Sequence, residues 1–356
     1  MTRRLTMFAL VLLLAACAST DLDQRAESPQ GRYVATTGNS PVGAIPEVVL
    51  HDSARNKDVQ FSIEYPTRGT ANPLIVFSHG FGGSSRGYIG LSAYWASHGY
   101  VVIKPTHADS GRVAEMQAAS DIWQSQTPAD WMNRVRDITF ILDSLDTIEQ
   151  RYPELQGKID RTKIGVGGHS YGAYTAMLIG GARTFPGGTS YADPRVKAIV
   201  AMSPQGPGEA RGLTNESYAQ LRVPALFMTG TRDAGVTQDE TPEWRQQAYE
   251  LSPAGDKWLV VLEGARHGTF TGRFDEFEAM SARDARMRTP VEVDPATGQP
   301  IDTRASRAQI MSERARGAFG TARMLALAFW DLYLRGDAEG RTELERTRGG
   351  VAVQKK

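Results

Sequence analysis

Short apolar runs, separated by polar and turn-forming segments, recur along the whole chain. Runs of this kind predict strands that are buried on both faces of a sheet. They lie at residues 73–78, 100–103, 163–167, 196–202, 224–229 and 258–262. Ahead of them, apolar runs at 47–50 and 59–63 flank the turn-forming residues 52–56, which predicts an antiparallel start to the sheet.

Segments with helical spacing lie between the predicted strands. Tyr88, Leu91 and Trp95 mark one face of a helix that ends at Gly99. Thr127 is a good helix start, because proline and then an acidic residue follow it. Apolar residues continue that helix at the spacing of an amphipathic face: Val135, Ile138, Ile141, Leu142, Leu145 and Ile148.

A strongly apolar helix over residues 319–334, with Gly336 just past its end, closes the pattern. Strands alternating with helices predict the α/β class, with a mostly parallel, doubly wound sheet and an antiparallel N-terminal start. Ligands of such sheets bind outside the carboxyl ends of the strands. We expect this domain to span residues 44–340 and a polar tail to occupy residues 341–356.

Two stretches exceed what this fold needs. Residues 108–126 combine a few apolar side chains with polar ones, and predict either a cap over the site or an ordinary connecting loop. Residues 271–312 are long, charged and rich in turn formers at their centre. Because loops of this length are usually functional or disordered, we expect a surface insertion near the rim of the pocket.

The N-terminus has the arrangement of an export signal. Arg3 and Arg4 precede an apolar run over residues 7–16, which is too short for a membrane span of about 20 residues. The run ends in Leu14-Ala15-Ala16-Cys17, which resembles a bacterial lipobox. We expect a signal peptide over residues 1–16, and an ordinary secretory signal with a chance cysteine is the alternative.

Cys17 would then carry lipid and anchor the protein to a membrane. The polar residues that follow predict a flexible tether, so the lipidated cysteine and its tether would cover residues 17–43. The residue after the cysteine is Ala18, where an aspartate would mark another destination. This arrangement resembles the signal for sorting to the outer membrane of a Gram-negative bacterium. The predicted localisation is therefore exported and lipid-anchored.

Composition removes several classes of function. Forty basic and forty acidic residues give a net charge of zero, so no electrostatic footprint for nucleic acid exists. Cys17 is the only cysteine, which excludes a disulfide within the chain and suits an anchor. A hydrophobic content of 41% and a charged content of 22% are ordinary for a soluble globular body.

The segment Gly168-His169-Ser170-Tyr171-Gly172 carries the strongest chemical signal. It follows the apolar run at 163–167 and precedes a predicted helix. Gly-x-Ser-x-Gly in that context is typical of the sharp turn that exposes a nucleophilic serine above a sheet. Glycine suits the flanking positions because a side chain there would clash. Ser170 is the predicted nucleophile.

The order of chemical groups after Ser170 singles out a base and an acid. In enzymes that have this serine turn, the nucleophile precedes the acid in the sequence, and the acid precedes the histidine. His267 is the only histidine after Ser170, and it follows the predicted strand at 258–262. Asp233 follows the predicted strand at 224–229, where a carboxylate would orient the imidazole. Asp193 and Asp256 lie in the same interval, but Asp193 precedes a strand and should lie at the wrong edge of the sheet. Asp239 and Glu240, a few residues along the loop of Asp233, are the close rivals.

A second glycine-rich loop predicts the groups that stabilise negative charge. His79-Gly80-Phe81-Gly82-Gly83 follows the strand at 73–78, and its Phe81 N–H would join the Tyr171 N–H in an oxyanion hole. Trp123 and Phe270 are candidate pocket-wall aromatics, although either could belong to the core. His107 and Asp109 lie at a strand end, but two ligands are too few for a metal site. We expect no metal.

On these motifs the chain resembles the α/β-hydrolase superfamily over roughly residues 44–340. Segments 77–83, 96–103 and 168–172 are similar to dienelactone-hydrolase-like proteins, platelet-activating-factor-acetylhydrolase-like enzymes and cutinase-type polyester hydrolases. The resemblance implies a carboxylesterase or lipase-like serine hydrolase that needs no cofactor. It maps Ser170, Asp233 and His267 onto the family triad, and Phe81 and Tyr171 onto the oxyanion donors.

Two departures narrow the resemblance. Ser170 stands where true dienelactone hydrolases have cysteine, and Tyr171 stands where polyester hydrolases usually have methionine. The expected partner is a small-molecule, lipid or polymer ester. Two alternatives stay open: a non-catalytic ligand-binding lipoprotein on the same fold, and an amidase or peptidase with the same triad.

Overall fold

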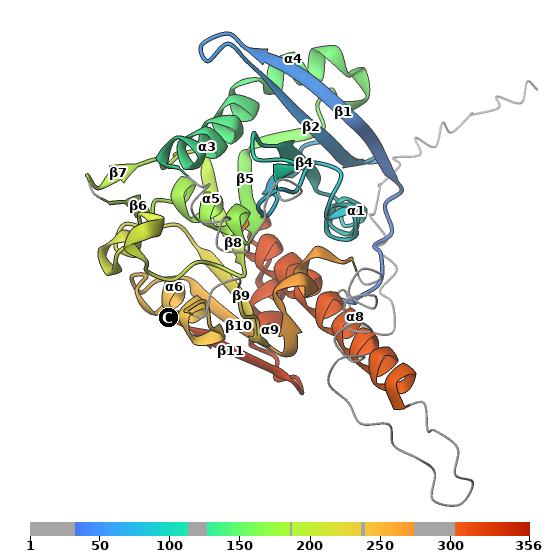
Figure 1. Ribbon diagram of the computed structural model, residues 1–356. Coiled ribbons are helices and arrows are strands. Elements are labelled where there is room, and N and C mark those ends of the chain that lie inside the picture. The colour runs from blue at the N-terminus through green and yellow to red at the C-terminus, as the bar shows by residue number, and fades with distance from the viewer. Residues whose placement is uncertain (1–32, 113–126, 186, 236–238, 274–302) are drawn as a thin grey trace, which may run out of the picture. The chain divides into compact units, whose positions relative to one another are not determined.

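A nine-stranded sheet, in the order β1-β2-β4-β3-β5-β8-β9-β10-β11, forms the centre of the protein (Figure 1). The computed structural model describes residues 33–112, 127–185, 187–235, 239–273 and 303–356. The strands of the sheet are β1 (Val42–Asp52), β2 (Lys57–Pro66), β3 (Asn72–Ser78), β4 (Val101–Thr106), β5 (Ile159–His169), β8 (Val196–Met202), β9 (Ala225–Arg232), β10 (Lys257–Arg266) and β11 (Val351–Lys355). A separate ribbon pairs β6 (Arg183–Thr184) with β7 (Thr189–Ser190).

The pairing of the strands confirms the predicted fold class. From β4 across to β10, every neighbouring pair is parallel. At the other end of the sheet, β1 pairs antiparallel with β2, and β2 with β4. This is the α/β-hydrolase fold. Because the parallel strands share one direction, the carboxyl ends of β3, β5, β9 and β10 meet at one edge.

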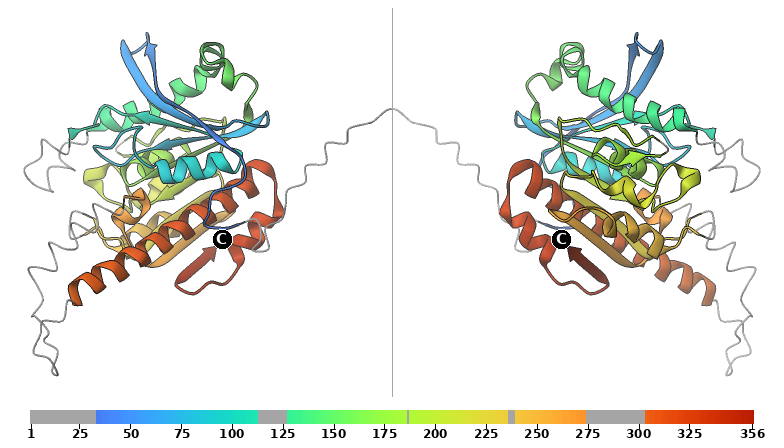
Figure 2. Two further views of the ribbon diagram at one scale, coloured as in Figure 1. Left: turned by 90° about the vertical axis from the view of Figure 1, so that its right-hand side faces the viewer. Right: turned by 90° about the vertical axis from the view of Figure 1, so that its left-hand side faces the viewer.

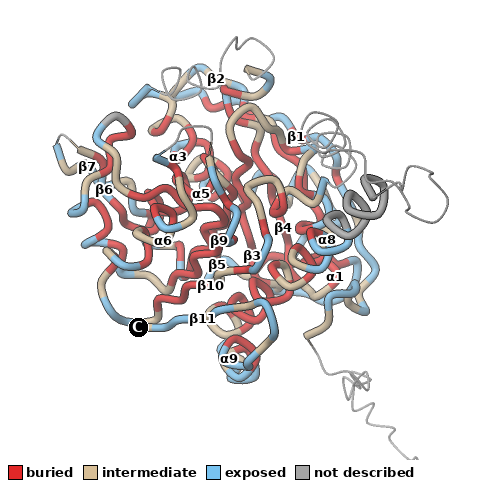
Figure 3. Tube along the Cα trace, turned by 60° about the horizontal axis from the view of Figure 1, so that its bottom comes forward, coloured by how far each residue is buried: buried red, intermediate tan, exposed pale blue. Residues whose placement is uncertain are grey.

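Apolar layers cover both faces of the sheet. The alternation along β3 shows this directly, since Leu74 and Val76 belong to one buried cluster while Ile75 and Phe77 belong to the other. Figure 3 shows the central strands buried along most of their length. A strand with apolar side chains on both faces reads as a continuous apolar run, which explains the sequence pattern.

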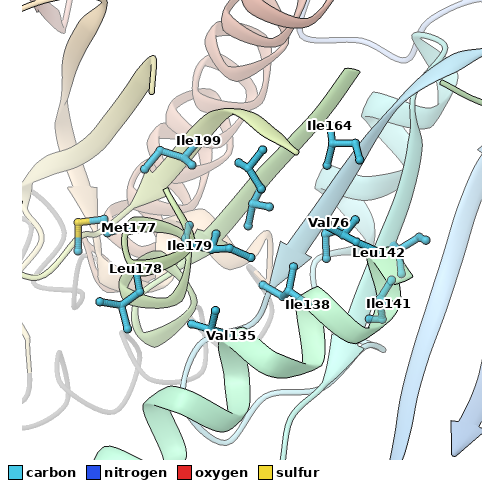
Figure 4. Packing of buried hydrophobic residues seen from close by; sticks show 14 of the residues in the cluster. Val76, Val135, Ile138, Ile141, Leu142, Ile164, Met177, Leu178, Ile179 and Ile199 are labelled. Atoms are coloured by element: carbon cyan, nitrogen blue, oxygen red, sulfur yellow. The ribbon is translucent and has the colours of Figure 1, made fainter. Parts of the chain in front are cut away.

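The helices divide between these two layers. The first layer receives α3 (Pro128–Asp143), α4 (Leu145–Arg151), α5 (Tyr171–Ile179) and α6 (Pro242–Glu250). The second receives α1 (Ile89–Ser97), α8 (Thr303–Trp330) and α9 (Ala338–Glu345). Figure 4 shows Val135, Ile138 and Ile141 of α3 packed toward α5 and β3. The long helix α8 runs along its own side of the sheet (Figure 2).

The start of α3 follows the predicted chemistry, whereas its end does not. Thr127 and Asp130 form a capping box, with Pro128 in the first turn. The sequence predicts one helix through Ile148, but α3 stops at Asp143. Ser144 leaves the helical conformation, with φ −96° and ψ 7°, and α4 begins after it. Apolar spacing survives this break, so the spacing alone did not reveal it.

Helix α8 begins at Thr303, well before the predicted start at 319, and a turn of π-helix over Asp331–Arg335 continues it to Gly336. The predicted insertion over 271–312 therefore overlaps a helix from 303 onward. The first part of α8 is rich in alanine and arginine, which favour helix by intrinsic propensity without an apolar stripe. Residues 274–302 lie outside the described residues, as do 113–126 of the predicted cap.

The polar tail predicted over residues 341–356 is wrong. Residues 338–345 form α9, and β11 pairs antiparallel with β10, from Trp258 opposite Lys355 to Leu262 opposite Val351. Val351 and Val353 pack against the second apolar layer, while Ala352 and Gln354, which alternate with them, are exposed. That alternation of period two marks a strand with one solvated face, and it was overlooked because the segment is short.

The predicted tether ends earlier than residue 43. The Tyr33 hydroxyl donates to Asp331 at 3.2 Å, the Tyr94 hydroxyl donates to the carbonyl of Val34 at 2.8 Å, and the Gly38 N–H donates to Ser97 at 2.8 Å. These bonds attach the segment before β1 to α1 and to the end of α8. Residues 1–32, with the predicted signal peptide and Cys17, lie outside the described residues. Within the described part of the chain, no helix has the length and apolarity that crossing a membrane requires.

Candidate active site

Ser170 sits at the turn between β5 and α5 with a backbone that few residues adopt. Its φ is 55° and its ψ is −120°. Flanking glycines make this turn sterically allowed, because a Cβ at Gly168 would collide with the carbonyl of Gly172 and a Cβ at Gly172 would collide with that of Ser78. Strained backbone of this kind clusters at functional sites. The turn presents the Ser170 hydroxyl at the carboxyl edge of the sheet.

The structure brings Ser170, His267 and Asp233 together from three separate loops. His267 Nε2 lies 2.9 Å from Ser170 Oγ, and its Nδ1 lies 2.9 Å from Asp233 Oδ1. A carboxylate only accepts hydrogen bonds, so Nδ1 carries the proton of a neutral imidazole and Nε2 accepts from the serine hydroxyl. This arrangement is the geometry of a nucleophile, a base and an orienting acid.

Asp233 is fully buried and held as an anion. Burial raises the pKa of Asp233, but the hydrogen bond from His267 and the charge of Arg245 outweigh it and lower the pKa to about 2. Thr229 donates to the second carboxylate oxygen at 2.9 Å. A carboxylate that stays ionised can fix the imidazole tautomer throughout a reaction.

The rival acids lie in other surroundings. Asp193 precedes β8 at the amino end of the sheet and pairs with Arg195 at 2.7 Å. Asp239 and Glu240 both contact Arg211, at 3.0 and 3.1 Å. Asp256 precedes β10 and accepts from the Tyr333 hydroxyl at 2.8 Å. The contact with His267 therefore belongs to Asp233.

Phe81 and Tyr171, the predicted oxyanion donors, both line the pocket beside Ser170. Tyr171 is the first residue of α5, so its N–H is one of those at a helix start with no partner inside the helix. Their rings contact each other at a centroid distance of 6.1 Å. The two N–H groups thus come from neighbouring segments at the same end of the sheet.

A buried arginine, which the sequence analysis missed, supports the loop of Phe81. Arg134 of α3 is 1% exposed and donates to the carbonyl of His79 at 2.8 Å. It also pairs with Asp109 at 2.7 Å, and Asp109 in turn accepts from the Gly82 N–H at 2.9 Å. The backbone on both sides of Phe81, at His79 and at Gly82, is therefore held by one ion pair. Polar residues on an amphipathic helix usually face water, so the sequence around Arg134 gave no sign that its side chain is buried.

The same arginine reaches the second predicted donor. The Arg134 guanidinium lies over the ring of Tyr171, 4.2 Å from its centroid. Burial raises the pKa of Asp109, but the charge of Arg134 outweighs it and holds the pKa well below its usual range. The contact between Arg134 and Asp109 is thus an ion pair at neutral pH.

His107 and Asp109, which the sequence places at a strand end, lie beneath the loop of Phe81. His107 Nδ1 is 2.9 Å from Asp137, and its Nε2 is 2.9 Å from the hydroxyl of Ser78. The backbone N–H of His107 donates to His79 at 3.0 Å. Burial lowers the pKa of both histidines. These side chains are engaged in a buried polar network.

A cavity of about 960 Å³ opens over the site. It is lined by residues of the predicted oxyanion loop (residues 79–83), the turn around Ser170 and the loop of His267, among them Phe81, Tyr88, Ser170, Tyr171, His267 and Thr271. Of the two places predicted for Phe270, pocket wall and core, the structure shows the core, because Phe270 is fully buried and packs against the ring of His169. Trp123 lies outside the described residues.

Comparisons with known proteins relate the chain to ester hydrolases. The sequence model of the Chlorophyllase family matches residues 33–186, which include the predicted oxyanion loop and Ser170 but not Asp233 or His267. Platelet-activating factor acetylhydrolase of the dog, Canis lupus familiaris, is 31% identical over 234 residues, which are 57% of this chain and 48% of the relative. The guinea-pig enzyme of the same name, from Cavia porcellus, is 26% identical over 237 residues, which are 57% of this chain and 49% of the relative.

The chain spans about half the length of the curated relatives it matches. Together with the sheet order, these matches relate it to serine esterases of the α/β-hydrolase superfamily.

Proposed function

We propose that the protein hydrolyses carboxylic esters through an acyl-enzyme, with Ser170 as nucleophile, His267 as base and Asp233 as the orienting acid. The observation that carries this proposal is the hydrogen-bonded chain of the three side chains, with both contacts of His267 at 2.9 Å. It lies at the carboxyl edge of the sheet, inside a cavity that also contains the predicted oxyanion donors. The relationship to esterases supports ester over amide substrates.

Acylation follows from the positions of the protons. Ser170 Oγ attacks the ester carbonyl carbon while its proton passes to His267 Nε2. The resulting imidazolium is stabilised by the Asp233 carboxylate, and the N–H groups of Phe81 and Tyr171 donate to the oxyanion. Each such donor is worth about 2.7–4 kcal/mol in other hydrolases. The C–O bond then breaks, and the alcohol departs with the proton from His267.

Deacylation repeats the same steps with water. His267 takes a proton from a water molecule, whose oxygen attacks the acyl carbon. The tetrahedral intermediate uses the same two N–H donors, and its collapse returns the proton to Ser170 and releases the acid. The side chains of this chain thus supply every proton transfer of both half-reactions.

Hydrolysis of p-nitrophenyl esters from acetate to palmitate tests the proposal, with Ser170→Ala as the matched control. The relatives' name makes acetyl esters the first members to measure. Activity that is lost in Ser170→Ala, while the variant keeps its thermal unfolding midpoint, supports the proposal, and the profile gives the acyl preference. A folded protein that cleaves peptide anilides better than esters would support an amidase. Binding without turnover of either class would favour a ligand-binding role.

We propose in addition that the protein is exported and lipid-anchored at Cys17, in the outer membrane of a Gram-negative bacterium. The basic residues, the short apolar run and the single cysteine of the N-terminal segment support this localisation. Metabolic labelling with a radioactive fatty acid tests it. Label that is present in the natural chain and absent from Cys17→Ser supports the anchor, whereas equal labelling of both, or none in either, argues against it.

A further inference from the structure

We propose that Tyr88 and His169 are positioning residues that couple the oxyanion loop to the loop of the catalytic histidine. This inference rests on the proposed function, because it assigns a role to two residues beside the triad. Neither residue reacts with substrate in this scheme. They join the N–H of Gly80, the residue before Phe81, to the backbone carbonyl of His267 through a continuous chain of hydrogen bonds.

Three contacts form this chain. The Gly80 N–H donates to the Tyr88 hydroxyl oxygen at 3.0 Å. The same oxygen lies 2.9 Å from His169 Nδ1, and His169 Nε2 lies 2.9 Å from the carbonyl oxygen of His267. Tyr88 and His169 are separated by 81 positions in sequence, so the chain is a product of the tertiary fold.

The donor and acceptor roles along the chain have one consistent assignment. A carbonyl oxygen only accepts, so His169 Nε2 carries the proton. Nδ1 of the neutral ring is then an acceptor, and the Tyr88 hydroxyl donates to it. The hydroxyl oxygen keeps a lone pair for the Gly80 N–H. Every polar group in this chain of hydrogen bonds thereby has a partner. A buried polar network with all its groups paired is rigid and carries no penalty for unpaired polar atoms.

The ring of His169 stays neutral while the neighbouring triad histidine changes charge. Burial lowers the pKa of His169 well below its ordinary value, and the charge of His267 lowers it further. The two imidazole rings lie 4.7 Å apart between centroids. A second cation at this distance would oppose the imidazolium that forms during catalysis. A neutral His169 therefore supports the loop of His267 without disturbing its proton transfer.

The backbone of Tyr88 supplies an independent argument. Its φ is 58° and its ψ is 24°, in the left-handed region at the start of α1. For a bulky residue this conformation is an outlier, whereas glycine adopts it freely. A tyrosine here adds a hydroxyl within reach of Gly80 and His169 that glycine would lack. The ring also packs against Phe77 at 5.1 Å, so its position is fixed.

Both ends of this chain of hydrogen bonds lie beside the proposed catalytic groups. At one end, the bonded N–H belongs to Gly80, the residue before Phe81, whose own N–H is a proposed oxyanion donor. At the other end, the bonded carbonyl belongs to His267 itself. Catalytic groups must be held within about 0.5 Å of their productive geometry, and a misplacement of about 1 Å can cost 100-fold in rate. Loss of the chain should therefore lower kcat rather than weaken substrate binding.

Tyr88→Phe is the sharpest test, because it removes one oxygen and keeps the ring. Tyr94→Phe is the matched control, since Tyr94 lies on α1 and its hydroxyl bonds to Val34 instead. With the natural chain as reference, we expect Tyr88→Phe to lower kcat about tenfold with KM within twofold. Tyr94→Phe should leave both constants within twofold.

A trifluoromethyl ketone gives a readout that a merely structural role would not move. Such a ketone adds to the nucleophilic serine and forms an oxyanion, so its inhibition constant reports the oxyanion hole. We expect the inhibition constant of Tyr88→Phe to rise by the same factor by which kcat falls. His169→Gln, which offers an amide N–H near the position of Nε2, should recover part of the activity lost in His169→Ala.

A double variant completes the test. Because the two residues act as one unit, Tyr88→Phe combined with His169→Ala should cost less than the product of the two single losses. The inference is overturned if Tyr88→Phe matches Tyr94→Phe in kcat and in ketone inhibition. It is also overturned if the two losses multiply fully. Failure of the proposed function is distinguishable, because the natural chain would then show no Ser170-dependent ester hydrolysis at all.

Discussion

Arg245 Nε lies 3.0 Å from Asp233 Oδ1, the same carboxylate oxygen that His267 contacts. Both partners are at most 2% exposed on their side chains. The arginine also donates to the carbonyls of Asp233, at 2.9 Å, and of Ser203, at 3.1 Å. The buried Arg245 guanidinium thus lies against the proposed catalytic acid. It also connects the backbone of Asp233 to the loop after β8.

Replacement of this arginine should destabilise the protein strongly. Arg245→Met leaves the Asp233 carboxylate buried beside no permanent cation, and breaking a buried pair from one side costs about 3–5 kcal/mol. Urea unfolding measures the loss. Arg195→Met is the control, because the Arg195 side chain, which pairs with Asp193, is 35% exposed. Ion pairs that water reaches contribute about 0–1 kcal/mol to stability. Equal losses in the two variants would contradict the assignment.

Stability should fall at acid pH through the buried carboxylates. The pKa values of Asp137 and Asp233 are both lowered in the folded protein from 3.8 to about 2. A carboxyl group with a depressed folded pKa contributes stability that is complete above the unfolded value and lost as pH falls through the folded one. We therefore expect the free energy of unfolding to be nearly flat from pH 7 to 5 and to fall steeply between pH 4 and 2.

Urea unfolding at a series of pH values checks this expectation. For each carboxyl group the lost stability is about 2 kcal/mol, from the size of its pKa shift. Asp137→Asn should remove its share of the pH dependence along with part of the stability. A free energy of unfolding that stays constant down to pH 2.5 would show that these carboxylates are not held as anions.

Substitution of the proposed catalytic acid should abolish most of the rate. Asp233→Asn keeps the size of the side chain but favours the wrong imidazole tautomer, which lowers kcat about 10⁴-fold in other triads. Asp239→Asn is the control, because Asp239 lies a few residues along the chain and contacts Arg211. Ester hydrolysis separates the two. A severe loss in Asp239→Asn beside an active Asp233→Asn would transfer the role of acid to Asp239.

The serine turn should not tolerate a methyl group. In Gly172→Ala the new Cβ would meet the carbonyl of Ser78, which is backbone and cannot move aside. We expect loss of esterase activity and a lower unfolding midpoint. Gly317→Ala is the control, because its position in α8 is open and alanine favours helix by about 1 kcal/mol. If Gly172→Ala keeps full activity, the turn is less constrained than its geometry indicates.

Much of the fold and of the site could be predicted because their signals are local. Apolar runs on both faces of a sheet require continuous burial, which explains why the parallel strands were found. The turn around Ser170 needs glycine on both sides for steric reasons, and chain order restricted the base to His267. Weaker local signals misled: the alternation in Val351–Lys355 was overlooked, and the break at Ser144 leaves the apolar spacing intact.

The sequence by itself determined the class of sheet and named Ser170, His267 and Asp233 as candidates, since short segments encode strands, turns and their order. Tertiary structure alone decided which acid faces the imidazole, because Asp233 and His267 are 34 positions apart and two rivals follow on the same loop. It also decided that Arg134 supports the loop of Phe81 and that Tyr88 meets His169. Such contacts depend on how elements that are distant in the sequence pack together. The periodicity of a short segment does not show which of its polar side chains becomes buried.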